Sequence, residues 1–276
     1  MINLNKIIRE VKEIYSNKKL IPFIGSGFSK PLELPSWEEL IKSVAADIGV
    51  ESDLLFLHGS YPQILDFVKK EHKSAWINFL HNLKVNFDSA ESNKKRQSSE
   101  THKILGKLDF KTIYTTNYDL HIEKAISGLG KTPNVLSDLE DFANTSGKKS
   151  DCDIIKFHGD LKKENMILTE TQYFERMALE EAVDQRLRSD LLSNSFLFIG
   201  YSFNDTNIRY IWYKIHKLKS SLSKNENDFE LRKSYYITFG NEPIQSRLLH
   251  NWDIEVVSLD PENRSKSLAE FLNCLT

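Results

Sequence analysis

The feature that most constrains this chain is an apolar run that ends in a glycine-rich turn. The run Leu20–Ile24 leads directly into Gly25-Ser26-Gly27, and a helix is predicted beyond the turn. Glycine lets the backbone turn sharply and approach a phosphate closely, because it has no Cβ. The succession is typical of a nucleotide-binding α/β fold. It lacks the third glycine of the full dinucleotide fingerprint, so an ordinary strand-to-helix turn is the alternative.

Three further polar motifs follow predicted strands along the chain. They are Thr116-Asn117-Tyr118-Asp119, Phe157-His158-Gly159-Asp160 and Gly200-Tyr201-Ser202-Phe203. In a parallel sheet, ligands bind beyond the carboxyl ends of the strands. Four polar loops at such ends therefore predict a single ligand crevice.

Strand and helix patterns alternate along most of the chain. Strands are predicted at 20–24, 112–115, 153–157, 166–168, 196–199, 235–239 and 254–257. Helical patterns separate them, and residues 52–108 carry helical patterns with no strand signal. This predicts an α/β, Rossmann-like fold, in which a mostly parallel sheet has helices on both faces and a helical insertion at about 52–108. With 276 residues, the chain is expected to form a single domain over 1–276.

Two finer expectations concern the helical segments. The apolar spacing at 171–192 predicts one long helix. The stretch 89–99 is rich in Ser, Asn and Lys and is expected to be a mobile, solvated loop.

Composition and charge exclude several classes of function. A net charge of −2 gives no electrostatic argument for binding nucleic acid or an acidic membrane. No apolar run reaches the roughly 18 residues of a membrane span, and the first residues do not form a signal peptide. We therefore expect a cytoplasmic protein with no direct nucleic-acid or membrane contact. The two cysteines, Cys152 and Cys274, form no Cys-x-x-Cys pair, so no metal site is expected.

Several polar side chains in the motifs are suited to chemistry. His158 follows a strand and precedes a glycine, which suits acid–base catalysis, although a structural histidine is the alternative. Asn117 offers a donor and an acceptor for a water molecule or a ribose hydroxyl. Ser202 is suited to a phosphate or a ribose. Asp119 and Asp205 either contact the ligand or cap the helices that follow them.

Two other catalytic patterns are absent. A hydrolytic Ser-His-Asp triad on such a sheet needs a Gly-x-Ser-x-Gly elbow, and neither Ser26 nor Ser202 lies in one. Gly130-Lys131-Thr132 is similar to the end of a phosphate loop, but Ala125 stands where that motif needs a glycine.

The four motifs, in this order, resemble those of the sirtuin (SIR2-like) superfamily. Gly25-Ser26-Gly27-Phe28-Ser29 is similar to the family's Gly-Ala-Gly-x-Ser. Thr115-Thr116-Asn117-Tyr118-Asp119 is similar to Thr-Gln-Asn-x-Asp, with Thr116 in place of Gln. His158-Gly159 matches the family's catalytic His-Gly, and Gly200-Tyr201-Ser202 matches its later Gly-x-Ser.

The resemblance implies a SIR2-like NAD-binding domain over 1–276 that uses NAD+ as its substrate and needs no metal. It implies that His158 and Asn117 are catalytic. It also implies that the following residues bind NAD+: Gly25, Ser26, Gly27, Ser29, Thr116, Asp119, Gly200, Ser202 and Asp205.

The chain lacks the two Cys-x-x-Cys pairs of the deacylase zinc module and a Val-Pro-Asn type of acyl-lysine channel signature. It therefore looks more like the bacterial SIR2-like proteins of antiphage defence. That branch implies an NAD+ glycohydrolase that acts as an abortive-infection effector by depleting NAD+. An NAD+- or ADP-ribose-binding regulatory module without turnover is one alternative, and an NAD-dependent protein deacylase is another.

Such an activity would be toxic without restraint. We therefore expect a homo-oligomer, an activating or restraining partner protein, or both. A partner of this kind could be an ATPase or a nucleic-acid-sensing subunit.

Overall fold

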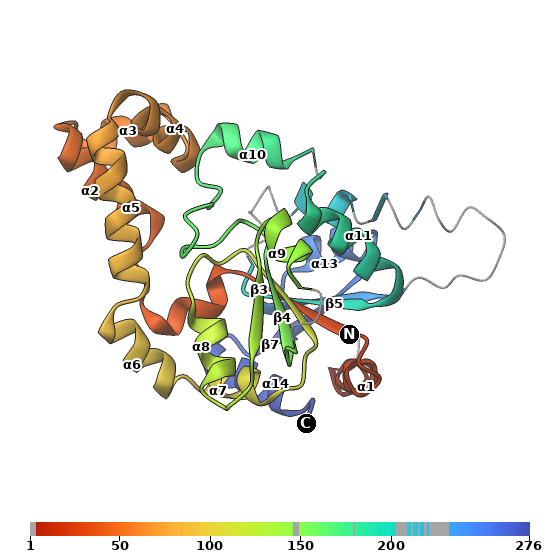
Figure 1. The fold of residues 1–276 in the computed structure, drawn as a ribbon. Helices are drawn as coiled ribbons and strands as arrows, with labels where there is room; N and C mark the ends of the chain where they lie inside the picture. Colours follow the sequence, from red (N-terminus) through yellow and green to blue (C-terminus); the bar gives the residue numbers. More distant parts are fainter. Residues whose placement is uncertain are drawn as a thin grey trace.

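Seven parallel strands form one sheet at the centre of the computed structural model (Figure 1). The structure describes residues 4–145, 149–178, 180–201, 209–210, 212–214, 216–217, 220 and 232–276. The strand order is β3-β4-β2-β1-β5-β6-β7. The strands are β1 (Leu20–Ile24), β2 (Thr112–Thr115), β3 (Pro133–Leu136), β4 (Cys152–Lys156), β5 (Ser195–Ile199), β6 (Ser234–Phe239) and β7 (Ile254–Leu259).

The central strands are buried on both faces, as their continuous apolar sequence predicts. Every residue of β1, β2 and β5 is buried. Helices cover one face with α1 (Leu4–Ser16), α7 (Glu100–Lys107), α8 (His121–Ser127) and α14 (Arg264–Asn273), and the other with α11 (Ala182–Ser193) and α13 (Pro243–His250). The predicted Rossmann-like fold, with a parallel sheet between helices, is confirmed.

A third apolar core lies outside the sheet. It is built by α2 (Trp37–Ile48), α4 (Tyr61–Glu71) and α5 (Lys73–Phe87), with α3 (Ser52–His58) beside them. Figure 1 shows these helices as a lobe at one side of the sheet. Tyr118, Leu161, Met166 and Leu168 belong to the same core. The loops after β2 and β4 are therefore anchored in the lobe as well as in the sheet.

The expectation of a loop at 89–99 is wrong, because Ala90–Ser98 forms the helix α6. The Ser89 side chain accepts a hydrogen bond from the Ser92 N–H and caps this helix. Lys95 pairs with Glu91 on the same helix and with Glu33, which follows the 3₁₀ helix η1 (Ser26–Leu32). A cap, a pair within the helix and one tertiary ion pair thus accompany a helix in this polar segment.

The single helix expected at 171–192 is also wrong. The structure has α10 (Glu170–Arg176) and then α11, which starts at Ala182. A buried ion pair joins Arg176 at the end of α10 to Asp184 in the first turn of α11. Residues 166–168 form no strand, whereas β3, α9 (Leu139–Ala143) and α13 were not predicted.

The strand order reverses beside β1. The chain leaves β1 towards β2 on one side of the sheet, and it leaves β5 towards β6 on the other. This switch point is where open α/β sheets form a ligand crevice. Gly200 follows β5 at a φ of +78°, and a Cβ built on it would lie 2.5 Å from the backbone nitrogen of Phe28.

We predict that Gly200→Ala lowers the free energy of unfolding by about 3 kcal/mol or more, because left-handed strain and backbone contact combine. Gly49→Ala is the matched control, since Gly49 has a φ of +71° but an added Cβ would meet nothing within 4 Å. That control should cost about 1 kcal/mol. Urea denaturation measures both values, and equal losses would contradict the prediction.

Candidate functional site

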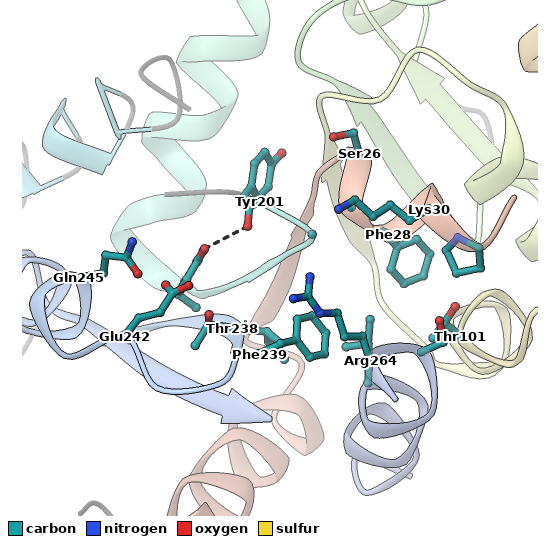
Figure 2. A pocket seen from close by; sticks show the side chains of 17 residues that line it. Ser26, Phe28, Lys30, Thr101, Tyr201, Thr238, Phe239, Glu242, Gln245 and Arg264 are labelled. Carbon is teal, nitrogen blue, oxygen red and sulfur yellow. Dashed lines mark hydrogen bonds between the residues drawn. The ribbon is translucent and has the colours of Figure 1, made fainter. Parts of the chain in front are cut away.

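A cavity of about 570 Å³ lies at the carboxyl ends of β1, β5 and β6 (Figure 2). It is the crevice expected at the switch point. Its lining comes from η1, the turn after β5, the end of β6 and the start of α14. The lining residues are Ser26, Gly27, Phe28, Lys30, Pro31, Thr101, Gly200, Tyr201, Tyr236, Ile237, Thr238, Phe239, Glu242, Gln245, Arg264, Ser265 and Leu268.

The glycine turn packs directly against the turn after β5. The Gly25 N–H donates to the Ile199 carbonyl at 2.8 Å, and the Gly27 N–H donates to the Gly200 carbonyl at 2.8 Å. A Cβ on Gly27 would lie 2.7 Å from the Gly200 oxygen. Only glycine permits this approach. Gly25, Gly27 and Gly200 therefore shape the rim of the cavity.

Charged side chains of both signs face the cavity. Figure 2 shows Lys30 and Arg264 extending from η1 and α14 towards the same space, which Glu242 and Gln245 also border. Within the described part of the chain, neither Lys30 nor Arg264 has an ion-pair partner. Two cations against the single carboxylate of Glu242 in the lining favour an anionic ligand such as a diphosphate.

Behind the glycine turn, three predicted site residues form a buried network. The Asn117 Nδ2 donates to Ser29 Oγ at 3.2 Å and to the Gly25 carbonyl at 3.3 Å. Ser29 Oγ donates to Asp119 Oδ2 at 3.1 Å. The buried Asn117 Oδ1 has no hydrogen-bond partner within the described residues. An unsatisfied buried acceptor is rare and marks a place where a ligand or water is held.

Asp119 makes two hydrogen bonds, of which one is the helix capping that the sequence offered as an alternative to ligand contact. Its Oδ1 accepts a hydrogen bond from the His121 N–H at the start of α8, which is helix capping. Its Oδ2 accepts from Ser29 in the buried network. Asp119 therefore holds the network while it starts the helix.

Tyr201 lies between the cavity and this network. Its hydroxyl donates to the Ile24 carbonyl at 3.0 Å and is 3.0 Å from Thr116 Oγ1. Its ring occupies the space beside Gly25, where an added Cβ would be 2.7 Å from the ring. The predicted site residue Thr116 thus meets the cavity wall through Tyr201.

His158 is buried after β4, with only 6% of its surface exposed. Its ring meets the edge of the Tyr173 ring at 5.5 Å between centroids. Burial, together with the nearby Arg176 guanidinium, lowers the pKa of His158 to about 3. Neither ring nitrogen has a hydrogen-bond partner among the described residues. At neutral pH the imidazole is uncharged and has a free lone pair.

Asn117 and His158 occupy equivalent positions on neighbouring strands. Thr115 of β2 pairs with Lys156 of β4, and each site residue follows two positions later. Neither residue lines the cavity, whereas Ser26, Gly27 and Gly200 do. The predicted residues thus fall into two groups, one that lines the cavity and one that is buried outside its lining. Ser202 and Asp205 lie outside the described residues.

Sequence reasoning missed Lys30, Tyr201, Glu242 and Arg264 as site residues. Lys30 and Tyr201 adjoin the motifs, and their positions there were the available signal. Glu242 and Arg264 follow the last two strands, and nothing local distinguishes them from surface charges. They reach the cavity only because β6 and α14 lie beside the switch point.

No group of three or more His, Cys, Asp and Glu that could hold a metal occurs in the described residues. Within the same residues, no helix has the length and hydropathy needed to cross a membrane.

A Rossmann-like sheet with a glycine turn and a cavity at its switch point has the features of α/β proteins that bind nucleotides. A family model described as SIR2-like domain matches residues 111–257, which is more than half of the chain. The chain therefore belongs to the SIR2-like family.

Several relatives share most of this chain. It is 32% identical over 228 residues to "NAD(+) hydrolase ThsA" of Cytobacillus dafuensis, covering 81% of this chain and 43% of the relative. It is 34% identical over 214 residues to "NAD(+) hydrolase ThsA" of Acinetobacter baumannii (strain 532279), covering 76% and 41%. "Defense-associated sirtuin 2" of Bacillus subtilis is 26% identical over 255 residues, covering 90% and 23%. The chain thus spans less than half the length of these relatives.

We predict that His158 makes the protein less stable as the pH falls from about 6.5 towards 3. The folded pKa of about 3 lies below the ordinary value of 6.5, so the unfolded chain binds the extra proton in this window. The contribution is up to about 1.4 kcal/mol per pH unit. Urea denaturation at pH 6.5 and pH 5 should show a smaller stability loss for His158→Gln than for the unmodified protein. His81→Gln, at an exposed position, is the control, and equal losses in all three proteins would contradict the prediction.

Proposed function

We propose that this chain is an NAD+ glycohydrolase, which converts NAD+ and water into nicotinamide, ADP-ribose and a proton. The observation that carries the proposal is that the cavity with Lys30 and Arg264, the buried Asn117 network and His158 all lie at the carboxyl ends of neighbouring strands. The printed names of several relatives describe the same reaction type.

In this proposal the diphosphate lies against Ser26 and Gly27, which line the cavity where η1 begins. Lys30 and Arg264 supply the positive charge. Gly200 permits close approach of the ligand to the turn after β5. Ser202 and Asp205 contact the adenosine half of the molecule.

The nicotinamide end then passes Tyr201 and enters the buried region around Asn117 and His158. The nicotinamide ring of NAD+ carries a positive charge, and it becomes neutral when it leaves, so it is a good leaving group. The protein therefore needs mainly to orient the ribose and to admit one water. The free Asn117 Oδ1 accepts a hydrogen bond from that water or from a ribose hydroxyl. The neutral His158 imidazole takes a proton from that water as the glycosidic C1′–N bond breaks and the C1′–O bond to the water oxygen forms.

The biological role proposed is abortive-infection defence against phage by depletion of NAD+. The chain would act as one SIR2-like domain over 1–276, with residues of about 52–108, which form α3 to α7, as its helical insertion. Assembly with other copies, or with a partner protein, would restrain the activity until infection.

We predict that the purified protein releases nicotinamide from NAD+ and that His158→Ala or Asn117→Ala lowers kcat by about 10² to 10⁴-fold. Both residues contact the reacting ribose or water in the proposal. His81→Ala is the matched control and should retain full turnover. Chromatographic quantification of nicotinamide measures the rates. Full turnover by His158→Ala would contradict its role, and ADP-ribose binding without any turnover would favour a regulatory module.

We predict that Arg264→Gln raises KM for NAD+ about tenfold and leaves kcat within about twofold, because a diphosphate contact is lost equally in ground and transition states. Lys266→Gln changes the charge of the same helix outside the cavity lining and should leave KM unchanged. Initial-rate kinetics at fixed ionic strength measure both. An equal rise in KM for both variants would indicate a general electrostatic effect instead.

A further inference from the structure

A lysine is fully buried beneath the Asn117 loop. Lys156 is the last residue of β4, and none of its side chain is exposed. Its ammonium group donates to the carbonyl oxygens of Asn117 at 3.3 Å and Tyr118 at 3.5 Å, and to that of Asp119. Lys156 thus contacts three consecutive residues of the loop that carries the buried network.

One carboxylate balances this charge. Glu123 on α8 places its Oε1 2.8 Å from the Lys156 ammonium nitrogen. Burial raises the pKa of Glu123 above its usual range, and the Lys156 ammonium opposes that rise. A buried ion pair is a costly way to obtain stability, because apolar residues of similar size often stabilise a fold as well or better.

The pair gives the loop a fixed geometry. The three carbonyls converge on one point, so the path of the Asn117-Tyr118-Asp119 backbone is set by the position of the Lys156 ammonium. That ammonium belongs to the strand that leads to His158 two residues later. Moving it would change the position of Asn117 relative to His158.

We propose that Lys156 is a positioning residue, which holds Asn117 in register with His158 across the β2–β4 pair. This proposal rests on the proposed NAD+ glycohydrolase function. Lys156 is sealed from the cavity and touches no substrate, so it acts through the loop. A misplacement of about 1 Å in an active site can cost about 10²-fold in rate.

The test separates positioning from stability. The double variant K156M/E123M removes both charges together and leaves no buried charge unpaired. We expect it to fold cooperatively, with a lower urea midpoint because three carbonyls lose their donor. We expect its kcat to fall about 10²-fold, with KM changed by less than about threefold. A stable double variant with unchanged kcat would overturn the proposal.

A second variant applies even where the double variant fails to fold. Glu123→Gln is isosteric and leaves the Lys156 ammonium on its three carbonyls. It should retain kcat within about threefold, because the geometry depends on the lysine. A 10²-fold loss in Glu123→Gln would overturn the proposal.

The chain offers a matched lysine at the other end of the strands, where they begin. Lys131, which precedes β3, donates to the carbonyls of Gly106, Lys107 and Leu108 at 2.8, 3.1 and 2.8 Å. Lys131→Met also removes a lysine from three consecutive carbonyls, but far from the site. It should lower stability and leave kcat unchanged. A loss of kcat equal to that of K156M/E123M would overturn the proposal.

Failure of the proposed function would be recognised separately. Absence of nicotinamide release by the unmodified protein overturns the proposed glycohydrolase function. Crystal structures then test by themselves whether Lys156 positions Asn117. In the unmodified protein the Asn117 Nδ2 to Ser29 Oγ contact is 3.2 Å. Loss of that contact in K156M/E123M supports the proposal, and an unmoved Asn117 overturns it.

Discussion

The close backbone approach between the two turns at the switch point is the constraint on which the site depends. The Gly27 N–H, in the turn after β1, donates to the Gly200 carbonyl in the turn after β5, and neither position has room for a Cβ. This contact brings the first and last motifs together, although more than 170 residues separate them. A side chain at either position would push η1 away and open the rim of the cavity.

The second and third motifs are fixed by a different device. Tyr118 packs in the core of the helical lobe and donates to the Ile167 carbonyl at 2.6 Å, which ties the β2 loop to the segment after β4. Its neighbours Asn117 and Asp119 point into the polar network instead. One loop therefore serves an apolar core and a polar site, so the lobe and the site are built together.

Strong local patterns predicted most of the sheet and the site motifs. Continuous apolar runs such as Phe196–Ile199, followed by a glycine, favour buried strands, and their polar ends mark the crevice. The edge strand β3 was not predicted, because it is short, starts at Pro133 and is only half-buried. Helix α6 has no apolar stripe that a local pattern would detect, and its pair between Lys95 and Glu33 is a tertiary contact. Arg264 was missed for the same reason, because its place at the cavity follows from packing alone.

The most direct test of the account is a crystal structure of the His158→Ala variant with NAD+ bound. The account predicts the diphosphate against Gly25-Ser26-Gly27 and the nicotinamide ribose within hydrogen-bond distance of Asn117 Oδ1, with Tyr201 moved aside. A dinucleotide bound in the cavity with its nicotinamide end directed away from Asn117 would contradict the claim that the cavity, Asn117 and His158 form one active site.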